Sequence, residues 1–129
     1  MVGARGLVVL VAALALGCAT GGSAGKHGAF DAHLITEDEI VASRATTAYD
    51  AIRKLRANFL SYRGETSLKN TSSPYPTVFV DDQPFGGIAM LRSIPAGQIA
   101  TIRLYRAWEA STRFGTGHMG GVIAINTRQ

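Results

Sequence analysis

A chain of 129 residues, 47% of them hydrophobic, has room for one domain and enough apolar side chains for a core, which excludes wholesale disorder. The formal net charge is +4, but apart from Arg5 the lysines and arginines are spread from Lys26 to Arg128, with one cluster at residues 53–56. Nucleic-acid-binding proteins usually concentrate basic residues on one face, so this charge predicts a solvated surface and no nucleic-acid partner.

The first 17 residues have the pattern of a secretory signal peptide. Arg5 is the only charged residue before an unbroken apolar run at residues 7–16. This run matches the central region of such a signal and is too short to cross a bilayer, because a membrane-spanning helix needs about 20 residues. We therefore expect residues 1–17 to be removed and leave them out of the fold.

Cys18 follows the apolar run and is the only cysteine, so an internal disulfide bond is impossible. Residues 14–18, Leu-Ala-Leu-Gly-Cys, resemble a bacterial lipobox, in which the thiol is diacylated and the signal is cut before the cysteine. Because two or more acyl chains anchor a protein stably, the resemblance implies that Cys18 is lipidated and holds the chain on a membrane. Ala15 and Leu16 stand in the reverse of the usual order, and ordinary signal cleavage after Ala15 or Ala19 is the alternative.

Residues 18–33 are predicted to be a lipid-anchored, flexible linker to a domain at residues 34–129. Gly, Ser, Ala and Thr dominate residues 19–28, a composition that buries little surface and behaves as a coil. The domain is expected to range about 15–20 Å from the membrane surface. The absence of Asp after Cys18 resembles lipoproteins that are sorted to the outer membrane of Gram-negative cells.

Two helices are predicted at the start of this domain, after a short apolar opening at residues 33–35. Thr36 and Glu39 have the spacing of a capping box, which begins a helix that runs to about Ser43. The second helix is expected at about residues 48–56, because apolar residues recur there at helical spacing. Its basic residues fall in the last turn, where they suit the helix dipole.

A strand, a loop and a second strand are predicted next. Residues 59–63 alternate as in a strand, and residues 64–76 contain Gly, Ser, Thr, Asn and two prolines without an apolar period. A loop of this length is either functional or loosely ordered. Residues 78–80 are expected to form a buried strand, closed by a turn at residues 81–84 in which Asp tolerates the left-handed conformation and Pro84 blocks further pairing.

The last third of the chain begins with a predicted short helix at residues 88–94, ended by Pro95. Residues 99–106 then alternate, so that Ile102 and Leu104 face one way while the residues between and after them face the other. This is the pattern of a strand with one covered face.

A helix and a final strand complete the domain. Residues 108–114 can form two helical turns, packed by Trp108, Ser111 and Phe114 or by their neighbours. The glycines that follow allow backbone angles that other residues resist, so the chain can reverse tightly into a strand at residues 121–127.

The order of these elements predicts an α+β fold, with a mixed sheet of about four strands and two or three short helices. From about residue 34 to residue 128 it resembles the plug domain of TonB-dependent outer-membrane receptors. The matching pieces are Leu34-Ile35-Thr36, Ala45-Thr46-Thr47, Val78-x-Val80-Asp81 with Pro84, Ile94-Pro95, Ile99-x-x-Ile102-x-Leu104-x-Arg106, Phe114-Gly115, and Gly120-Gly121-Val122-Ile123-x-Ile125-x-Thr127-Arg128. The resemblance implies an envelope protein on the periplasmic face of the outer membrane.

The chain also departs from this family. The family's plug lies inside a β-barrel of the same chain, and a 22-stranded barrel at about 10 residues per strand needs well over 200 residues. No such sequence follows Gln129, so we expect a free-standing module that is not itself a transporter. Residues 19–33 contain no match to the family's partner-pairing box, and Asp82 and residues 107–108 replace the residues of its usual tight turns.

Metal ligation and acid–base catalysis find little support. His27, His33 and His118 are not at ligand spacing from one another, and the only cysteine belongs to the predicted anchor. Asp81 and Asp82 are interpreted as turn residues, because adjacent residues in a tight turn rarely aim at one atom. We therefore predict no metal site and no catalytic carboxylate pair.

Two other patterns are also set aside. The glycines at positions 115, 117 and 120 match a dinucleotide fingerprint by letter, but they precede a strand instead of joining a strand to a helix. Ser73 and Ser111 lack the strand–turn–helix context of a nucleophile elbow. The sequence therefore predicts neither a cofactor nor an enzyme.

The resulting hypothesis is a non-catalytic envelope module with a protein-interaction or accessory role in outer-membrane uptake. Its expected partner is an outer-membrane β-barrel or another envelope protein, with the loop at residues 64–76 as the contact surface. A small-ligand-binding periplasmic domain, which would use this loop and the turn at residues 85–87, is the alternative. A receptor remnant without a present role is a third possibility.

Overall fold

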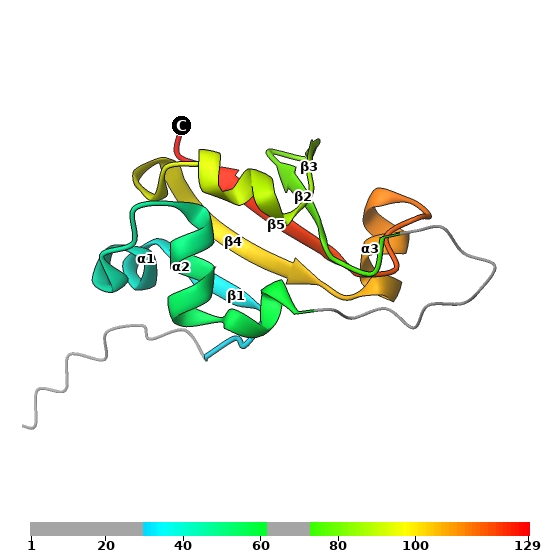
Figure 1. Cartoon of the computed structure of the whole chain (residues 1–129), viewed down its shortest axis with the longest axis horizontal. Coiled ribbons are helices and arrows are strands. Elements are labelled where there is room, and N and C mark those ends of the chain that lie inside the picture. The colour runs from blue at the N-terminus through cyan, green and yellow to red at the C-terminus, as the bar shows by residue number, and fades with distance from the viewer. Residues whose placement is uncertain (1–29, 62–72) are drawn as a thin grey trace, which may run out of the picture.

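The computed structural model describes residues 30–61 and 73–129. In this part of the chain a mixed five-stranded sheet is combined with short helices, which is the predicted α+β fold with one strand more than the four expected (Figure 1). The predicted signal peptide, Cys18, most of the predicted linker, residues 62–63 of a predicted strand and residues 64–72 of the predicted loop lie outside the described residues.

The sheet has the strand order β1-β4-β5-β2-β3. The strands are β1 (Leu34–Thr36), β2 (Thr77–Val80), β3 (Gln83–Gly86), β4 (Ile99–Tyr105) and β5 (Val122–Thr127). β5 pairs antiparallel with β4 and parallel with β2, and β1 and β3 form the two edges. Because β5 is central, residues 122–125 are all buried, which explains their continuous apolar sequence.

Six short helices lie in the described part of the chain. The α-helices are α1 (Glu37–Ser43), α2 (Ala48–Leu55) and α3 (Ala107–Phe114), and the 3-10 helices are η1 (Ala57–Leu60), η2 (Ile88–Ser93) and η3 (Ala96–Gln98). The predicted capping box begins α1, because the Thr36 amide donates to the Glu39 carboxylate at 2.9 Å and the Glu39 amide donates to the Thr36 hydroxyl at 3.4 Å.

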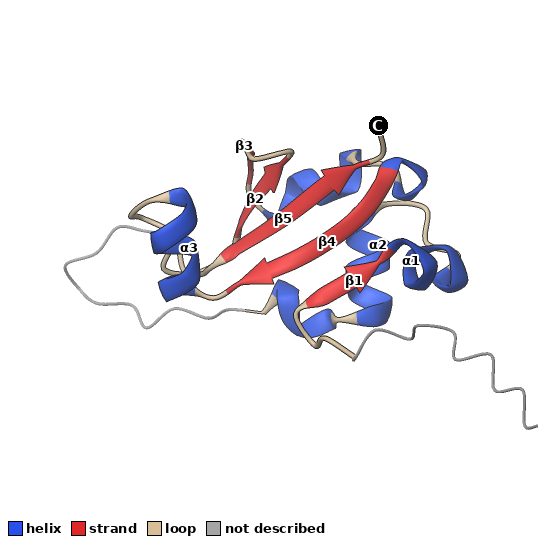
Figure 2. Cartoon of the chain, turned by 180° about the vertical axis from the view of Figure 1, so that it is seen from behind, coloured by secondary structure: helices blue, strands red, loops and turns tan. Residues whose placement is uncertain are grey.

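The main core lies between the sheet and the layer formed by α1, α2, η1 and η2 (Figure 1). It is filled by large apolar side chains that are at most 1% exposed: Ile35, Ile52, Phe59, Val78, Leu91, Ile99, Ile102, Leu104, Ile123 and Ile125. Burying one such side chain contributes about 1.5–3 kcal/mol. On the opposite face, α3 covers one end of the sheet over a smaller cluster of Phe79, Ala110, Val122 and Ala124 (Figure 2).

The predicted strand at residues 59–63 is wrong over its described part. Residues 57–60 form the 3-10 helix η1, in which the Phe59 amide donates to the Arg56 carbonyl at 2.9 Å. Phe59 is fully buried in the main core. A short alternating run fits one helical turn as well as a strand, and the burial of Phe59 decides between them.

The turn after β2 is shorter than predicted. Asp81 and Asp82 have φ angles of 49° and 63°, which confirms that aspartates hold the left-handed turn positions. The prediction that Pro84 blocks pairing is wrong, because Pro84 is part of β3 and lies opposite Phe79 of β2. Proline is tolerated there since an edge strand has a neighbour on one side alone.

The helix predicted at residues 108–114 is present, but Trp108 does not pack it. Trp108 is 69% exposed, whereas Ala110 is fully buried. The Phe114 ring lies 4.5 Å from the Phe79 ring and 5.4 Å from the Tyr105 ring, centroid to centroid. Phe114 and the neighbouring Ala110 therefore hold α3 on the sheet.

Two glycines complete the reversal into β5. A Cβ atom at Gly120 would collide with the backbone carbonyl of Tyr75, and one at Gly121 would collide with that of Tyr105. Gly121 also has a φ of 87°, in the region that favours glycine. These close approaches bring residues 74–75 against the start of β5.

Candidate functional site

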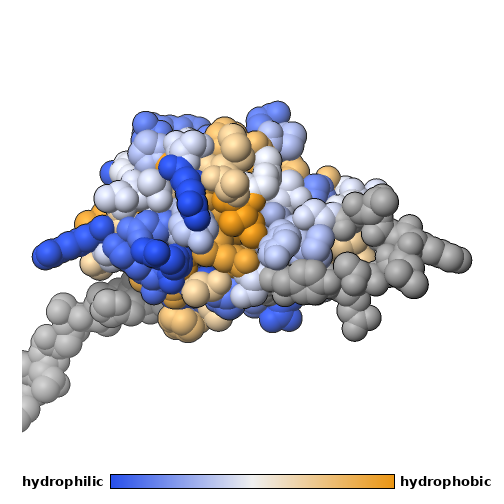
Figure 3. Space-filling view, in the orientation of Figure 1, coloured by the Kyte–Doolittle hydropathy of each residue, from blue (hydrophilic) through white to orange (hydrophobic). Residues whose placement is uncertain are grey.

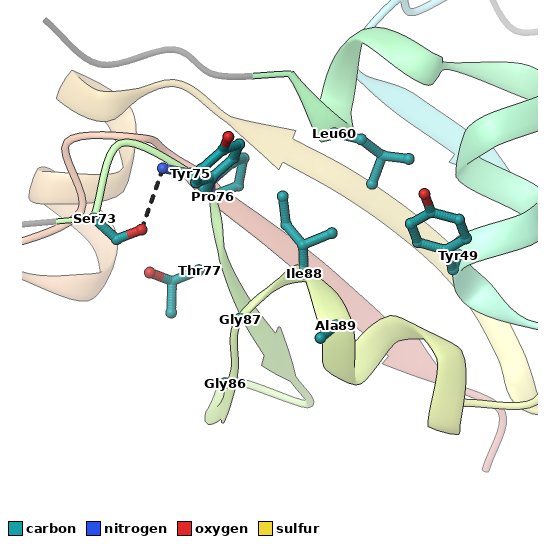
Figure 4. Close-up of a pocket in the computed structure, with 10 residues that line it drawn as sticks. All are labelled: Tyr49, Leu60, Ser73, Tyr75, Pro76, Thr77, Gly86, Gly87, Ile88 and Ala89. Atoms are coloured by element: carbon teal, nitrogen blue, oxygen red, sulfur yellow. Dashed lines mark hydrogen bonds between the residues drawn. The ribbon is translucent and has the colours of Figure 1, made fainter.

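A groove of about 580 Å³ opens on the helical face of the molecule. Its lining residues come from α2, η1, the segment before β2, and the turn from β3 into η2: Tyr49, Leu60, Ser73, Tyr75, Pro76, Thr77, Gly86, Gly87, Ile88 and Ala89 (Figure 4). Small-molecule sites in proteins commonly have about 300–1,000 Å³. The groove is therefore large enough for a ligand, and Figure 3 shows apolar surface in the middle of this face.

The chain builds one wall of the groove where it crosses from the sheet edge to the helical layer. Gly86 has a φ of 140°, and a Cβ atom there would lie 2.8 Å from the Met90 side chain. Gly87 has open space around its Cα. These two glycines allow the chain to leave β3 and begin η2, which places Ile88 against the main core and Ala89 at the surface.

The opposite wall comes from α2 and η1. Tyr49 and Leu60 are half-buried and pack against the edge of the main core. Figure 4 shows them across the groove from Ile88 and Ala89. Apolar side chains and glycine backbone thus dominate both walls.

Polar atoms at the groove are few. The Ser73 hydroxyl accepts a hydrogen bond from the Tyr75 amide at 3.3 Å, and Thr77 lies at the same end. The guanidinium carbon of Arg92 lies 4.4 Å from the centre of the Tyr49 ring. Among the residues that the structure describes, no Asp, Glu, His or Lys lines the groove.

The groove joins the two segments that the sequence singled out for ligand capture. Of the loop at residues 64–76, Ser73, Tyr75 and Pro76 line it; of the turn at residues 85–87, both glycines do. Phe85 does not line the groove. Sequence reasoning missed Tyr49, Leu60 and Ile88, because it treated them as residues of separate elements.

A second hollow, of about 380 Å³, surrounds the exposed Trp108. It is lined by Arg106, Ala107, Trp108, Met119 and Gly120. Trp108 is 69% and Met119 43% exposed, and the Arg106 guanidinium lies 3.1 Å from the His33 ring nitrogen Nε2. We call these five residues the Trp108 surface.

The Trp108 surface and the groove meet at residues 74–75. Gly120, in the Trp108 surface, approaches the backbone of both residues closely, and Tyr75 also lines the groove. The described end of the predicted contact loop therefore adjoins both candidate sites.

The residues that were considered for metal binding lie apart. His33 contacts Arg106, and His118 has its Nδ1 3.3 Å from the Thr77 hydroxyl and its ring edge-on to Phe79. His27 lies outside the described residues. Across residues 30–61 and 73–129, no group of three His, Cys, Asp or Glu side chains is placed to hold a metal ion.

The two turn aspartates make structural contacts. The Asp81 carboxylate accepts hydrogen bonds from the Thr127 hydroxyl at 2.6 Å and from the Thr127 amide at 2.9 Å. These hydrogen bonds lower the pKa of Asp81. Asp82 lies 3.4 Å from the Arg113 guanidinium.

The two serines also contact backbone groups. Ser111 donates to the Ala107 carbonyl at 2.8 Å, and Ser73 accepts from the Tyr75 amide. Both hydrogen bonds are local to the helix or turn that carries the serine.

No helix within residues 30–61 and 73–129 is long and apolar enough to cross a membrane.

Comparison of the chain with protein-family models, with curated proteins and with solved structures found no match.

Proposed function

We propose that the chain is a non-catalytic, lipid-anchored module of the bacterial envelope that resembles a free-standing TonB-dependent receptor plug. In this proposal acyl chains on Cys18 hold it at the periplasmic face of the outer membrane. The folded domain docks on an outer-membrane β-barrel or another envelope protein and has an accessory role in uptake. The order of the sequence motifs supports the plug-like role.

The Trp108 surface is the observation that carries the docking role. An indole ring buries a large apolar area when it is covered, yet Trp108 is 69% exposed on a helix that Ala110 and Phe114 already fix. Trp, Met and Arg are enriched in protein interfaces and in their hot spots. Trp108, Met119 and Arg106 bring these three residue types together around one hollow.

Site-specific photocrosslinking in the native envelope tests this proposal. A benzophenone amino acid at position 108 is expected to give one discrete adduct, whose partner mass spectrometry identifies as a β-barrel or another envelope protein. Val41 on α1 is the matched control position, because it is also an exposed apolar residue (63%) but lies outside the Trp108 surface. Equal adducts from positions 108 and 41, or none from position 108, would contradict docking through this surface.

The groove favours a second candidate function, a small-ligand-binding periplasmic domain. It supports this alternative because two segments distant in sequence form one apolar hollow of ligand size. Saturable ligand binding by the isolated mature chain would distinguish this function from protein docking. Failure to detect the mature protein in cells would favour a receptor remnant without a present role.

A further inference from the structure

We propose that the groove binds a single-chain anionic amphiphile, such as a medium-length fatty acid, with its tail between α2 and η2 and its head group beside Arg92. This inference rests on the ligand-binding candidate and gives that candidate a chemical class. It does not depend on docking through the Trp108 surface.

The lining of the groove selects an apolar body. Leu60, Pro76 and Ile88 contribute hydrocarbon, Tyr49 and Tyr75 contribute rings, and none of the lining residues in the described part of the chain is charged. A hydrocarbon tail leaves no unpaired polar atom in such a place. Each buried methylene group is expected to tighten binding about three- to fourfold.

The shape of the groove favours an elongated molecule with one end in water. Tyr49 and Leu60 stand along one side, and Ile88 and Ala89 stand opposite them (Figure 4). Ala89 is exposed and Ile88 is half-buried, so the hollow reaches the surface rather than closing over its contents. A tail can lie between these walls while a polar head group stays hydrated.

The charge at the Tyr49 end selects an anionic head group. Arg92 is exposed, its guanidinium lies over the Tyr49 ring, and it makes no ion pair with any described residue. The neighbouring carboxylate of Asp50 does not compete for it, because Asp50 pairs with Arg53 at 3.0 Å and with Lys54 at 2.9 Å. A carboxylate at this end therefore meets a positive charge that has no acidic partner within residues 30–61 and 73–129.

Calorimetric titration of the mature chain with saturated carboxylates of eight, ten and twelve carbons tests the proposal. The chain carries Cys18→Ala, so that acyl chains of its own do not enter the groove, and all ligands stay below their micelle concentrations. We expect saturable binding of one carboxylate per chain that tightens about threefold or more with each added methylene. Dodecyltrimethylammonium, with the same tail and opposite charge, is expected to bind at least about fivefold more weakly than dodecanoate.

Two pairs of variants locate the ligand. Arg92→Gln is expected to weaken dodecanoate binding about two- to fivefold, the range for one exposed charge pair. Arg44→Gln is its control, since Arg44 is also exposed and without an ion pair among the described residues but lies outside the groove. Ala89→Trp fills the groove from an exposed position and should weaken binding at least about tenfold, while Ala42→Trp on α1 should not.

The outcomes separate this inference from the function on which it rests. Unaltered thermal unfolding shows that each variant is folded. Absence of saturable binding by all four ligands overturns the inference, whereas the ligand-binding candidate is overturned by the absence of saturable binding of ligands of other classes as well. Binding that Ala89→Trp abolishes, but that is equally tight for the cation and the carboxylate, overturns the anionic class and keeps the candidate. Binding that ignores chain length or Ala89→Trp places the ligand elsewhere and overturns the inference.

Discussion

Asp81 links the β2–β3 turn to the end of the central strand through one side chain. It holds a positive φ angle, and its carboxylate accepts both hydrogen bonds from Thr127 in β5. The sequence identifies Asp81 as a turn residue, because aspartate tolerates the left-handed conformation. The second role was not visible, since Thr127 is 46 residues away along the chain.

The hydrogen bonds of Asp81 predict an acid-sensitive contribution to stability. Hydrogen bonds from the Thr127 hydroxyl and amide lower the pKa of the Asp81 carboxyl group below the ordinary value for an aspartate. A carboxyl group whose pKa is lowered by folding stabilises the protein above the unfolded-state pKa, and this contribution is lost as pH falls through the lower folded-state pKa. Asp81→Asn is therefore expected to flatten the fall in the free energy of unfolding below about pH 4, as measured by urea titrations at a series of pH values.

Thr127→Val is the partner variant for this measurement. It removes the hydroxyl donor while keeping the side-chain shape, so it should reproduce part of the Asp81→Asn effect. In the Asp81→Asn background it should change the pH dependence little further. Independent, additive effects of the two changes would mean that the Asp81–Thr127 contact is not their cause.

Among the elements, α3 shows how a local pattern can indicate a helix correctly and its packing side wrongly. An aromatic residue at each end of the predicted helix suggests that both rings pack. In the structure Phe114 lies against Phe79 and Tyr105, whereas Trp108 lies outside the contact with the sheet. The rotation of the helix is set by Ala110, which is small enough to let α3 approach the sheet closely.

This arrangement predicts opposite results for the two aromatic residues of α3. Phe114→Ala is expected to lower the free energy of unfolding by about 1–3 kcal/mol, because it removes a partly buried ring from the smaller cluster. Trp108→Ala should change it by less than about 0.5 kcal/mol, because the indole is 69% exposed. Urea unfolding followed by circular dichroism measures both, and a large loss from Trp108→Ala would show that the indole stabilises the fold.

In the whole molecule, the two candidate sites lie on different faces of the sheet. The groove lies on the helical face, and α3 with its exposed indole lies at one end of the opposite face (Figures 1 and 2). Tyr75 lines the groove, and its backbone lies close to Gly120 of the Trp108 surface.

The proposed attachment of the chain to a membrane through Cys18 can be tested directly. If Cys18 is lipidated, the wild-type chain should remain in the membrane fraction, and its intact mass should exceed that of the polypeptide by the acyl chains. Cys18→Ala should move the chain into the soluble periplasmic fraction. Two or more buried acyl chains hold a protein stably on a membrane, and this substitution removes the residue that carries them. An unmodified mass would support ordinary signal cleavage instead, and continued membrane attachment of Cys18→Ala would show that acyl chains on Cys18 are not what holds the protein there.

Elements with local signals could be predicted from the sequence alone. Three such signals are clear. The capping box at Thr36 and Glu39 marks the start of α1, the alternation of apolar residues indicates β4, and the continuous apolar run indicates the buried strand β5. These patterns are sufficient for the α+β class and for most element positions. They are sufficient because the period of apolar residues in a helix or a strand is set by the local backbone geometry and appears among residues close in sequence.

Features that join distant segments depend on tertiary packing and could not be predicted from the sequence. Residues 57–60 form η1 instead of the predicted strand, because Phe59 is buried in the main core. Pro84 is part of β3, because β3 is an edge strand. Trp108 is exposed, because it lies outside the contact between α3 and the sheet. The groove arises in the same way, because its walls come from α2, η1, the β2 approach and η2. A linear pattern records the period of each segment but not which side chains will face one another across a space, so neither candidate site could be assembled from the sequence.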